Sequence, residues 1–426
     1  MITKRPGLGR HPVGQLLQTL VLGLTLMPSV TEANAVTDWG AIANDFAFIH
    51  AARPAPPIIV ELAYVHLAVY DAVNAIDGRY SVFAVKPTTS AQGASAEAAT
   101  AAAAYTVLKW LYPAQQALLQ ATYVNYLMGL PPGRAKDQGI AIGTEVAAAF
   151  VALRAGDGRN ANVPYSFRFG PGEYQLTPGA PPPPIAPLTP RVGEMKTFAI
   201  QSATQFRADG PPDLTSSQWA EDFNEVKVYG AQTRSLRTPR QTEIGQFYAE
   251  HPPNQFHRNV RGIAIAYQLS LADAARFYAE VYVTTADALI TVWNSKYFFN
   301  FWRPVTAIRV AATDDNPDTE PDPPLVTTPA HPEYPAAHGA VSGGLAYALE
   351  QFFGTNRVAV TLTSTSVPGI AIAEHHFTNT QNMVREIINA RVYGGMHYRT
   401  SGVHGTVIAR KVARYVARHH FRPVSE

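Results

Sequence analysis

Apolar residues recur at helical spacing through most of the chain, three or four positions apart. Runs rich in glycine and proline separate these segments and mark where helices end. The segments with this period are 58–76, 91–127 with a break near Pro113, 136–155, 261–290, 336–353, 381–393 and 406–419, and further helices are expected to start at Ser216 and Thr238. The pattern predicts an all-α protein built from one or two helical bundles.

Residues 161–191 interrupt the helical pattern, since they contain four consecutive prolines at 181–184 and scattered glycines. Such a composition cannot support the interior of a helix or a sheet. The stretch is predicted to connect an N-terminal helical region, 36–160, to a C-terminal helical region, 192–426, that carries the candidate chemistry. Two interpretations remain open: an interdomain strap, or a loop over the mouth of an active site.

The first 35 residues have the pattern of an export signal. Basic residues near the start precede an apolar run over 13–27, and Ala33-Asn34-Ala35 follows as a small-x-small cleavage site. A membrane span needs about 20 apolar residues, so a signal peptide over 1–35 is predicted, with an uncleaved anchor as the alternative. The mature protein is expected in the periplasm or outside the cell, and no later stretch is expected to cross a membrane.

Composition narrows the possible partners and chemistries. The net charge of +2 creates no field that would gather nucleic acid or an anionic membrane. The chain contains no cysteine, which excludes disulfides, thiolate zinc sites and a cysteine nucleophile. The 426 residues, 46% of them hydrophobic, suffice for one large or two medium globular units. A homo-oligomer is compatible with the sequence.

Nearly all candidate chemistry lies in three clusters between residues 293 and 399. In the first cluster, Lys296 and Arg303 are seven residues apart, about two helical turns, so both side chains would leave the same helix face. Arg303 precedes Pro304, which disfavours the α conformation, and the helix is expected to end or kink there. Two cations are thus expected near a helix end.

The other two clusters place histidines at helix ends. Pro335 suits the first position of the helix over 336–353, and His338 would lie in its first turn, where free amides and the helix dipole attract anions. In the third cluster, Arg391 would project from the end of the predicted helix 381–393, and His397 from the loop that follows. Together the clusters offer a tetrahedral oxyanion three cations and two imidazoles.

Lys-x6-Arg-Pro, then Pro-x-x-His, then Arg-x5-His resembles the signature of the vanadium-dependent haloperoxidases and of the related type 2 phosphatidic acid phosphatase superfamily. The resemblance extends into 219–248 and 63–76 and so covers most of the mature chain. It implies a helical-bundle enzyme that oxidises halide with hydrogen peroxide and uses an organic acceptor as a further small-molecule substrate. The implied cofactor is vanadate, with phosphate as a competing occupant.

Carried over residue by residue, the resemblance assigns a role to each motif position. The oxyanion clamp would consist of Lys296, Arg303, Arg391 and the backbone amide of Ala337. His397 would be the axial ligand to vanadium, or the nucleophile on phosphorus in the phosphatases, and His338 would be the acid/base histidine. The residue types fit these roles, because Arg presents a planar fork for paired oxygens and Lys a point charge.

Two positions depart from the family pattern. Ala336-Ala337 stands where the family usually has Ser-Gly, so a hydroxyl donor to the anion is missing, at a cost of about 1 kcal/mol, the net worth of a typical hydrogen bond. Ser401 stands where many members carry an aspartate four residues after the axial histidine. A second partner normally orients a ligating histidine, and Ser401 or a backbone carbonyl is expected to do so here.

Two residues bear on the choice of reaction. Trp293 resembles the tryptophan that lines the active site of fungal-type chloroperoxidases. His331 falls where bromoperoxidases tend to have histidine and chloroperoxidases phenylalanine. The resemblance therefore points to a haloperoxidase with Trp293 and His331 in its halide or substrate pocket, and it favours bromide or iodide over chloride.

Other polar residues are expected to have structural roles. His66 lies on an apolar helical face and is predicted to be a core residue, whereas His251 and His257 flank a proline turn and are predicted at the surface. The early turns of the helix that starts at Ser216 carry the acids Glu221, Asp222 and Glu225. These acids complement the helix dipole, or one of them orients a clamp arginine.

Three functions remain open. The preferred one is a vanadate-dependent haloperoxidase in which His338 manages protons. The second is a phosphomonoesterase with the same clamp, in which His397 attacks phosphorus and His338 protonates the leaving group. The third is a non-catalytic oxyanion-binding protein, suggested by Ala336 and Ser401.

Overall fold

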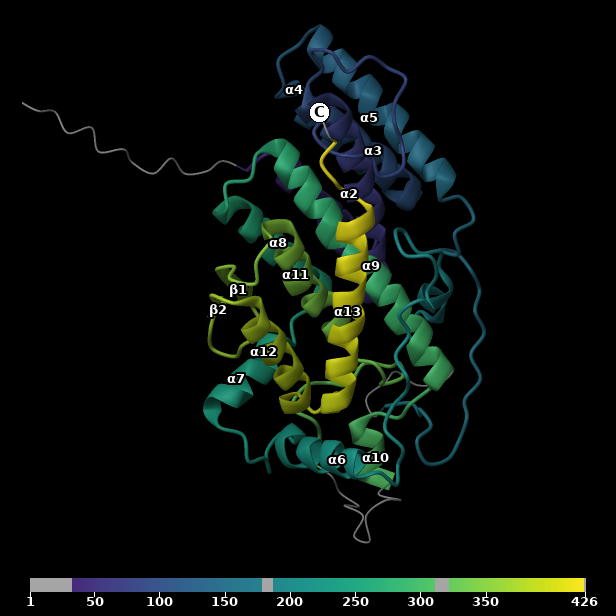
Figure 1. The fold of residues 1–426 in the computed structure, drawn as a ribbon, viewed down its shortest axis with the longest axis vertical. Coiled ribbons are helices and arrows are strands. Elements are labelled where there is room, and N and C mark those ends of the chain that lie inside the picture. The colour runs from purple at the N-terminus through teal and green to yellow at the C-terminus, as the bar shows by residue number, and fades with distance from the viewer. Residues whose placement is uncertain (1–32, 178–186, 311–321, 425–426) are drawn as a thin grey trace, which may run out of the picture. The chain divides into compact units, whose positions relative to one another are not determined.

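Helices make up nearly all regular structure of the residues that the computed structural model describes, 33–177, 187–310 and 322–424 (Figure 1). The α-helices are α1 (Ala35–Asp45), α2 (Ala55–Asp77), α3 (Ala96–Leu111), α4 (Gln116–Met128), α5 (Arg134–Leu153), α6 (Ser217–Gly230), α7 (Pro239–Phe247), α8 (Pro252–Ala266), α9 (Leu271–Phe299), α10 (Pro304–Val310), α11 (Ala337–Phe353), α12 (Thr380–Tyr393) and α13 (Arg399–His419). A single antiparallel hairpin within the described ranges pairs β1 (Val360–Ser364) with β2 (Ala373–Phe377). The predicted all-α class is confirmed, with this hairpin as an addition.

The predicted signal segment lies outside the described residues except for 33–35, and so do the four prolines at 181–184. Helix α1 begins at Ala35, and the side chain of Asn34 accepts hydrogen bonds from the backbone N–H groups of Val36 and Thr37 at 3.1 and 3.2 Å. Asparagine is a favoured residue at this capping position. Export of the chain stays a prediction.

Helix α9 forms the centre of the helical core. It packs against α2, α11 and α13, and nearly all its residues from Ala274 to Lys296 are buried. A helix buried on all sides is apolar all round, so its charged members require specific partners. Asp287 accepts hydrogen bonds from three successive backbone N–H groups, those of residues 198–200, at 2.7 to 2.9 Å. Lys296, near the end of the helix, is the first cation of the candidate site.

The N-terminal end of α11 lies directly against α13, beside which α11 runs in Figure 1. A Cβ atom added at Gly339 would lie 2.9 Å from the carbonyl oxygen of Gly402, and one added at Gly405 would lie 2.4 Å from that of Ala336. Backbone atoms cannot give way as a flexible side chain can, so glycine is required at both positions. This contact fixes the end of α11 that carries His338.

Helix α2 is long and apolar enough to cross a membrane, by length and composition, although no such stretch was predicted after the signal segment. Within the protein, 94% of its apolar window is buried, and the helix packs against α3 and α9. The burial accounts for the composition, because the central helix of a bundle needs the same apolar surface that a lipid-facing helix needs.

The described parts of the loop 161–191 run past the end of α9. The backbone N–H of Tyr174 donates to the carbonyl oxygen of Asn300 at 2.7 Å, and that of Leu188 donates to the carbonyl oxygen of Ala330 at 2.7 Å. The described residues from Ala33 onward form one compact unit. These contacts join the described parts of the loop to the end of α9 and to the segment before α11, and the choice between an interdomain strap and a loop over the mouth of an active site stays a prediction.

Candidate active site

Three buried cations from separate parts of the chain converge at one place. Lys296 lies in the last turn of α9, Arg303 in the link between α9 and α10, and Arg391 in the last turn of α12. Their exposed fractions are 0%, 0% and 1%. Each is close enough to the others to influence their ionisation. The structure therefore brings together the three cations that the sequence singled out.

Lys296 and Arg303 do not share a helix face, contrary to the prediction. Helix α9 ends at Phe299, and Asn300 follows in a left-handed conformation with φ of 52°. Arg303 lies in the short link that ends where Pro304 starts α10. Asparagine tolerates the left-handed conformation, and the residue before a proline avoids the α conformation. These two local preferences separate the helices and place the two cations on different elements.

The loop before α11 holds both of these cations through its backbone. Lys296 Nζ donates to the carbonyl oxygens of Pro332 and Glu333 at 2.9 and 2.6 Å. Arg303 Nε donates to the carbonyl oxygen of His331 at 2.9 Å. Carbonyl dipoles satisfy these donors without neutralising their charge, so the positive charge remains for a ligand.

Arg391 keeps part of its hydrogen-bonding capacity. Its Nη1 donates to the carbonyl oxygen of Tyr248 at 2.9 Å, and its Nη2 lies 3.4 Å from the sulfur of Met396. Its Nε is buried without a hydrogen-bond partner among the described residues. The carbonyl oxygen of Met396 accepts from Arg303 Nη1 at 2.9 Å, so Met396 lies between the two guanidinium groups.

Glu333 orients His397, a role that the sequence analysis gave to Ser401 or a backbone carbonyl. His397 Nδ1 donates to Glu333 Oε1 at 2.7 Å, and the backbone N–H of Tyr398 donates to the same oxygen at 3.1 Å. His397 Nε2 lies 3.2 Å from Nη1 of Arg303, which can only donate. The proton is therefore on Nδ1, and the lone pair of Nε2 faces the cations.

Sequence reasoning missed Glu333, although a signal was present. The residue directly precedes the second motif cluster, five positions before His338, and buried cations need a counter-charge nearby. That requirement draws attention to a carboxylate next to motifs that offer only positive groups and imidazoles. Ser401 is also buried, but no hydrogen bond joins it to His397 within the described residues; its side chain instead lies close enough to Glu333 to oppose the rise in the pKa of that carboxyl, so Glu333 takes the role predicted for Ser401.

The ionisation of these groups reflects a surplus of positive charge. Burial, then the charge of Arg303, lowers the pKa of Lys296 well below its ordinary value. The same two causes lower the pKa of Arg391 to about 9. Burial raises the pKa of Glu333 to about 7, against the opposing charges of Lys296 and Arg303. One carboxylate cannot balance three buried cations, so their charged forms are disfavoured.

His338 lies in the first turn of α11, as predicted. The helix begins one residue later than expected, at Ala337, and Pro335 stays outside it because Ala336 is extended and occupies the capping position. The N–H groups of Ala337 and His338 have no acceptor within the helix, and the helix dipole is positive at this end. His338 Nε2 is buried with no hydrogen-bond partner in the described ranges. Burial, then the charge of Arg391, lowers the pKa of His338 well below its ordinary value.

Trp293 and His331 lie side by side, with ring centres 4.8 Å apart. His331 is only 5% exposed, and its Nδ1 lies 3.0 Å from Arg303 Nη2. Trp293 Nε1 donates to the carbonyl oxygen of Leu188 at 3.3 Å, and Lys296 Nζ lies 5.8 Å from the Trp293 ring centre. Both predicted pocket residues thus lie beside the cations, and both are buried.

The acids of α6 do not serve the clamp, so that alternative is wrong. Glu225 pairs with Arg399 at 2.7 Å, Asp222 accepts from the backbone N–H of Thr400 at 3.2 Å, and Glu221 is exposed. These contacts join α6 to the start of α13. They stabilise the fold near the site without touching a clamp arginine.

His66 is a core residue, as predicted, but the surface prediction for His257 is wrong. His257 is 5% exposed, and its Nδ1 lies 3.0 Å from the hydroxyl oxygen of Tyr282. The prolines after His251 start helix α8 instead of forming a surface turn, since proline is favoured at the first helical positions. His257 therefore lies on the buried face of α8, while His251 is half-buried.

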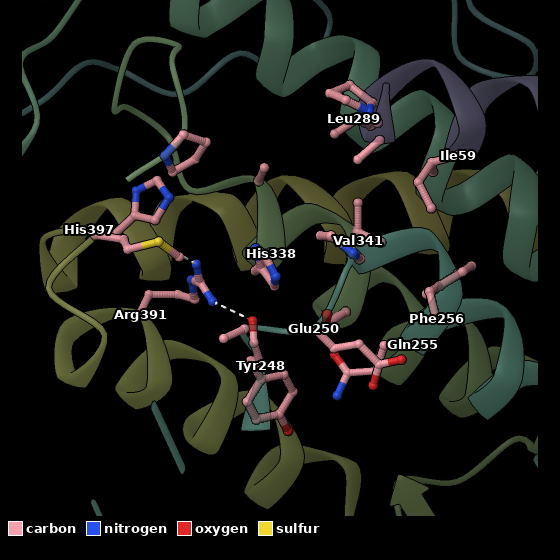
Figure 2. Close-up of a pocket in the computed structure, with 18 of the residues that line it drawn as sticks. Ile59, Tyr248, Glu250, Gln255, Phe256, Leu289, His338, Val341, Arg391 and His397 are labelled. Atoms are coloured by element: carbon pink, nitrogen blue, oxygen red, sulfur yellow. Dashed lines mark hydrogen bonds between the residues drawn. The ribbon is translucent and has the colours of Figure 1, made fainter. Parts of the chain in front are cut away.

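A cavity of about 240 Å³ adjoins the cations (Figure 2). At one end it is lined by polar side chains, His338, Arg391 and His397, with Trp293 and His331 beside them. At the other end it is lined by apolar side chains, among them Ile59, Phe256 and Leu289. The candidate site is therefore the polar end of a larger, mostly apolar space.

The donor set fits an anion rather than a metal cation. Within the described ranges, no three histidine, cysteine or carboxylate side chains gather as cation ligands. Buried cations, free helix amides and unpartnered nitrogens instead match the oxygens of a tetrahedral oxyanion. The fold and the site define a helical-bundle protein with a buried, cation-lined site whose donors suit an oxyanion.

Comparison with known proteins identifies the family of this part of the chain. Residues 276–426, which hold every motif residue, match the family described as the VCPO second helical-bundle domain. Vanadium chloroperoxidase from Curvularia inaequalis is 32% identical over 195 residues, which cover 37% of this chain and 31% of that protein. The chain thus spans less than a third of that curated relative.

Solved structures extend the likeness to nearly the whole chain. A structure described as the first bacterial vanadium-dependent iodoperoxidase has a TM-score of 0.76 and 22% identity, covering 92% of this chain and 97% of its own. A holo-type bacterial vanadium-dependent chloroperoxidase has a TM-score of 0.67 and 16% identity, covering 92% and 93%. Residues 276–426 therefore match the VCPO second helical-bundle domain, and the chain as a whole has the fold of the bacterial vanadium-dependent haloperoxidases of known structure.

Proposed function

We propose that this protein is a vanadate-dependent haloperoxidase that oxidises halide with hydrogen peroxide. The observation that carries the proposal is the charge imbalance at the site. Three fully buried cations are offset by one carboxylate among the described residues, that of Glu333. Burying uncompensated charge is costly, and a bound vanadate anion would supply the missing negative charge.

The residues have distinct roles in this proposal. Lys296, Arg303, Arg391 and the amide of Ala337 would hold the oxygens of vanadate, and His397, whose Nε2 lone pair faces the cations, would bind its vanadium. His338, whose Nε2 is unpartnered among the described residues, would hold and release a proton beside the bound anion. Vanadate, when bound, supplies a Lewis-acidic centre that activates peroxide toward two-electron oxidation of halide. The fixed cations add electrostatic stabilisation of developing negative charge.

Bromide or iodide is the proposed halide. The support is His331, whose ring packs on Trp293 and contacts Arg303, at the position where chloroperoxidases resembling this chain tend to carry phenylalanine. A further support is the likeness of the fold to a protein described as an iodoperoxidase. Rates measured with iodide, bromide and chloride on one preparation test the order directly.

The deciding experiment measures two activities on the same preparation, with and without added vanadate. We expect peroxide-dependent oxidation of iodide to triiodide, and bromination of a phenol, only after vanadate has been added. Hydrolysis of a phosphate monoester that vanadate inhibits, without any halide oxidation, would overturn the proposal. Metal analysis of the dialysed protein checks that one vanadium is retained per chain.

Phosphomonoesterase activity is the second candidate, and the orientation of His397 supports it. A neutral imidazole whose Nε2 lone pair faces the cations that would hold a phosphate ester is also suited to attack on phosphorus, and His338 could protonate the leaving group. The ester-hydrolysis arm of the experiment above separates the two reactions. Tight oxyanion binding with neither activity would instead indicate the third candidate, a non-catalytic oxyanion-binding protein.

We also propose that the chain is exported, on the pattern of residues 1–35. Expression with these residues in a bacterial host, followed by mass determination of the protein in the periplasm and medium, tests this. A mature chain that begins near residue 36 is expected. Retention of the full chain in the membrane fraction would point to an uncleaved anchor.

A further inference from the structure

We propose that the cavity beside the oxyanion site binds a neutral, apolar organic acceptor of one or two rings and holds it where halogen is transferred. This inference rests on the proposed function, since it assigns the acceptor of the same reaction. The alternative is an enzyme that releases oxidised halogen to react in solution. Its acceptors would be chosen by their own reactivity rather than by the protein.

One face of α11 leads from the site into the cavity. His338, Val341 and Leu345 are spaced at three and four residues, so their side chains share one side of the helix, and all three line the cavity. Leu345 is seven residues beyond His338, about 10 Å along the helix axis. The lining therefore changes from a histidine to two aliphatic side chains within two turns, moving away from the cations.

The far end of the cavity is lined by apolar side chains from three other elements. Ile59 comes from α2, Leu289 from α9 and Phe256 from α8. Figure 2 shows them on the side of the cavity opposite His397 and Arg391. Hydrogen peroxide and halide are small and strongly hydrated, and they gain nothing from such a surface. An apolar organic molecule gains by leaving water for it.

The polar side chains at the far end are already bonded within the protein. The Glu250 carboxylate accepts from both terminal nitrogens of Arg258 at 2.7 and 2.5 Å, and from the backbone N–H of Thr365 at 2.8 Å. Gln255 Nε2 donates to the carbonyl oxygen of Phe247 at 2.9 Å. A charged acceptor would therefore lose its hydration without new partners there. The selected class is neutral and apolar.

The volume sets the size of the occupant. An apolar cavity of about 150 Å³ in another protein stays dry and binds benzene. A cavity of about 240 Å³ has room for a fused two-ring aromatic compound together with the halide at the polar end. Indole, which is neutral and easily halogenated, is a suitable probe.

The reaction balances with the co-reactants of the proposed function. One halide, one hydrogen peroxide, one proton and one acceptor C–H give one carbon–halogen bond and two waters. The halide loses two electrons to peroxide, whose O–O bond breaks, and the halogen then replaces the acceptor hydrogen, which ends in water. Holding the acceptor beside His338 and Arg391 shortens the path from the oxidised halogen to the carbon.

The first test measures binding without any reaction. Indole is titrated into the protein by calorimetry, with and without vanadate and in the absence of peroxide, and tryptophan serves as a comparison because it carries the same ring with two charges. We expect saturable one-to-one binding of indole and affinity for tryptophan lower by about tenfold or more. Indole binding that does not saturate, or equal binding of the two compounds, overturns the inference.

A matched pair of variants locates the binding site. Val341→Phe adds a ring to the cavity and is expected to weaken indole binding by about tenfold or more. Val403→Phe makes the same change on α13, where Val403 is 39% exposed, and is expected to leave indole binding unchanged. Thermal unfolding shows whether each variant is folded. Unchanged indole affinity in folded Val341→Phe overturns the assignment to this cavity.

The second test measures selectivity during turnover. An equimolar mixture of indole and tryptophan is brominated by the vanadate-loaded protein and, separately, by reagent hypobromite. We expect the enzyme to raise the share of brominated indole about tenfold over the reagent, and the same product ratio from both would overturn the inference. This comparison uses the unaltered protein, so it holds even if Val341→Phe does not fold. If no bromide is oxidised at all, the proposed function fails, and the binding test alone judges the cavity.

Discussion

Two pairs of buried histidines share the direction of their pKa shifts but differ in what surrounds them. For His66 and His257 in the core, and for His338 and His397 in the site, burial is the largest cause that lowers the pKa. The core pair packs against tyrosine rings: His66 lies 4.3 Å from the ring of Tyr282, whose hydroxyl also contacts His257. The pKa values of the site pair are lowered further by all three clamp cations, whereas in the core pair Arg261 also lowers that of His257.

A buried, neutral histidine therefore does not by itself mark a functional site. Both pairs are kept uncharged, but an anion can act on one pair only. A bound anion near His338 and His397 would raise their pKa values and so oppose the effect of the cations. His66 and His257 do not line this cavity. Surplus positive charge together with a cavity distinguishes the site from the core.

The largest expected effect comes from removing a surplus cation. In Arg391→Met, charge-assisted hydrogen bonds worth about 1.5–3 kcal/mol each are lost, so affinity for vanadate is expected to fall by about 10²-fold or more. The anion-free variant is expected to be at least as stable as the original protein, because one of three repelling buried charges is gone. Calorimetry with vanadate and thermal unfolding without it measure both quantities.

An ion pair away from the site provides the control for that variant. Arg53 pairs with the buried Glu61 at 2.6 Å, and Arg159 lies 3.9 Å from the same carboxylate. Arg53→Met is expected to cost about 2 kcal/mol of unfolding free energy, less than a fully buried pair because Arg53 is partly exposed. Equal destabilisation of the anion-free protein by Arg391→Met would contradict the surplus of charge at the site.

The next effect separates the two kinds of histidine. His338→Ala is expected to lower turnover by about 10² to 10⁴-fold, the usual contribution of a general acid or base, while vanadate affinity changes little. His66→Ala is expected to leave turnover unchanged and to lower the unfolding free energy by about 2 kcal/mol, because it opens a cavity in the core. Unaltered turnover in His338→Ala would show that this histidine moves no proton in the reaction.

A smaller effect is expected at the residue that orients His397. Glu333→Gln keeps an oxygen acceptor but removes the negative charge, and losing such an outer partner typically costs about 10–100-fold in affinity or activity. Ser401→Ala is the matched control and is expected to have little effect. If Ser401→Ala were the more harmful of the two, the orientation of His397 would have to be reassigned.

The smallest predicted effect is a shift in ionisation on binding phosphate. A bound anion favours the protonated imidazole, so the pKa values of His338 and His397 are expected to rise by about one unit, equivalent to about 1.4 kcal/mol each. Those of His66 and His257 are expected to stay low, because burial causes their shifts. Histidine NMR spectra recorded against pH, with and without phosphate, resolve the four rings. A pKa rise of equal size in both pairs would show that the anion does not act selectively on His338 and His397.

The sequence predicted the members of the site better than their arrangement. Motif spacing was enough to select Lys296, Arg303, His338, Arg391 and His397, because the chemistry of an oxyanion needs those residue types and helix ends supply the positions. The geometry depended on local conformations that spacing does not encode. The left-handed turn at Asn300 and the extended Ala336 moved both helix boundaries.

Residues whose surroundings come from distant parts of the chain could not be predicted. Glu333 reaches His397 across 64 positions of sequence, and His257 is buried by Tyr282 of another helix. The hairpin of β1 and β2 has only five residues in each strand, too few for its alternation to be told apart from loop sequence. In each case the tertiary contact, rather than the local pattern, decides the outcome.

The loop of residues 331–333 contacts two of the three cations of the site and one of its histidines. Its three carbonyl oxygens hold Lys296 and Arg303, and its single carboxylate holds His397. A shift of this one loop would therefore disturb two cations and an imidazole simultaneously. Heat or denaturant is expected to abolish oxyanion binding in one cooperative step, without a partly assembled pocket that keeps a reduced affinity.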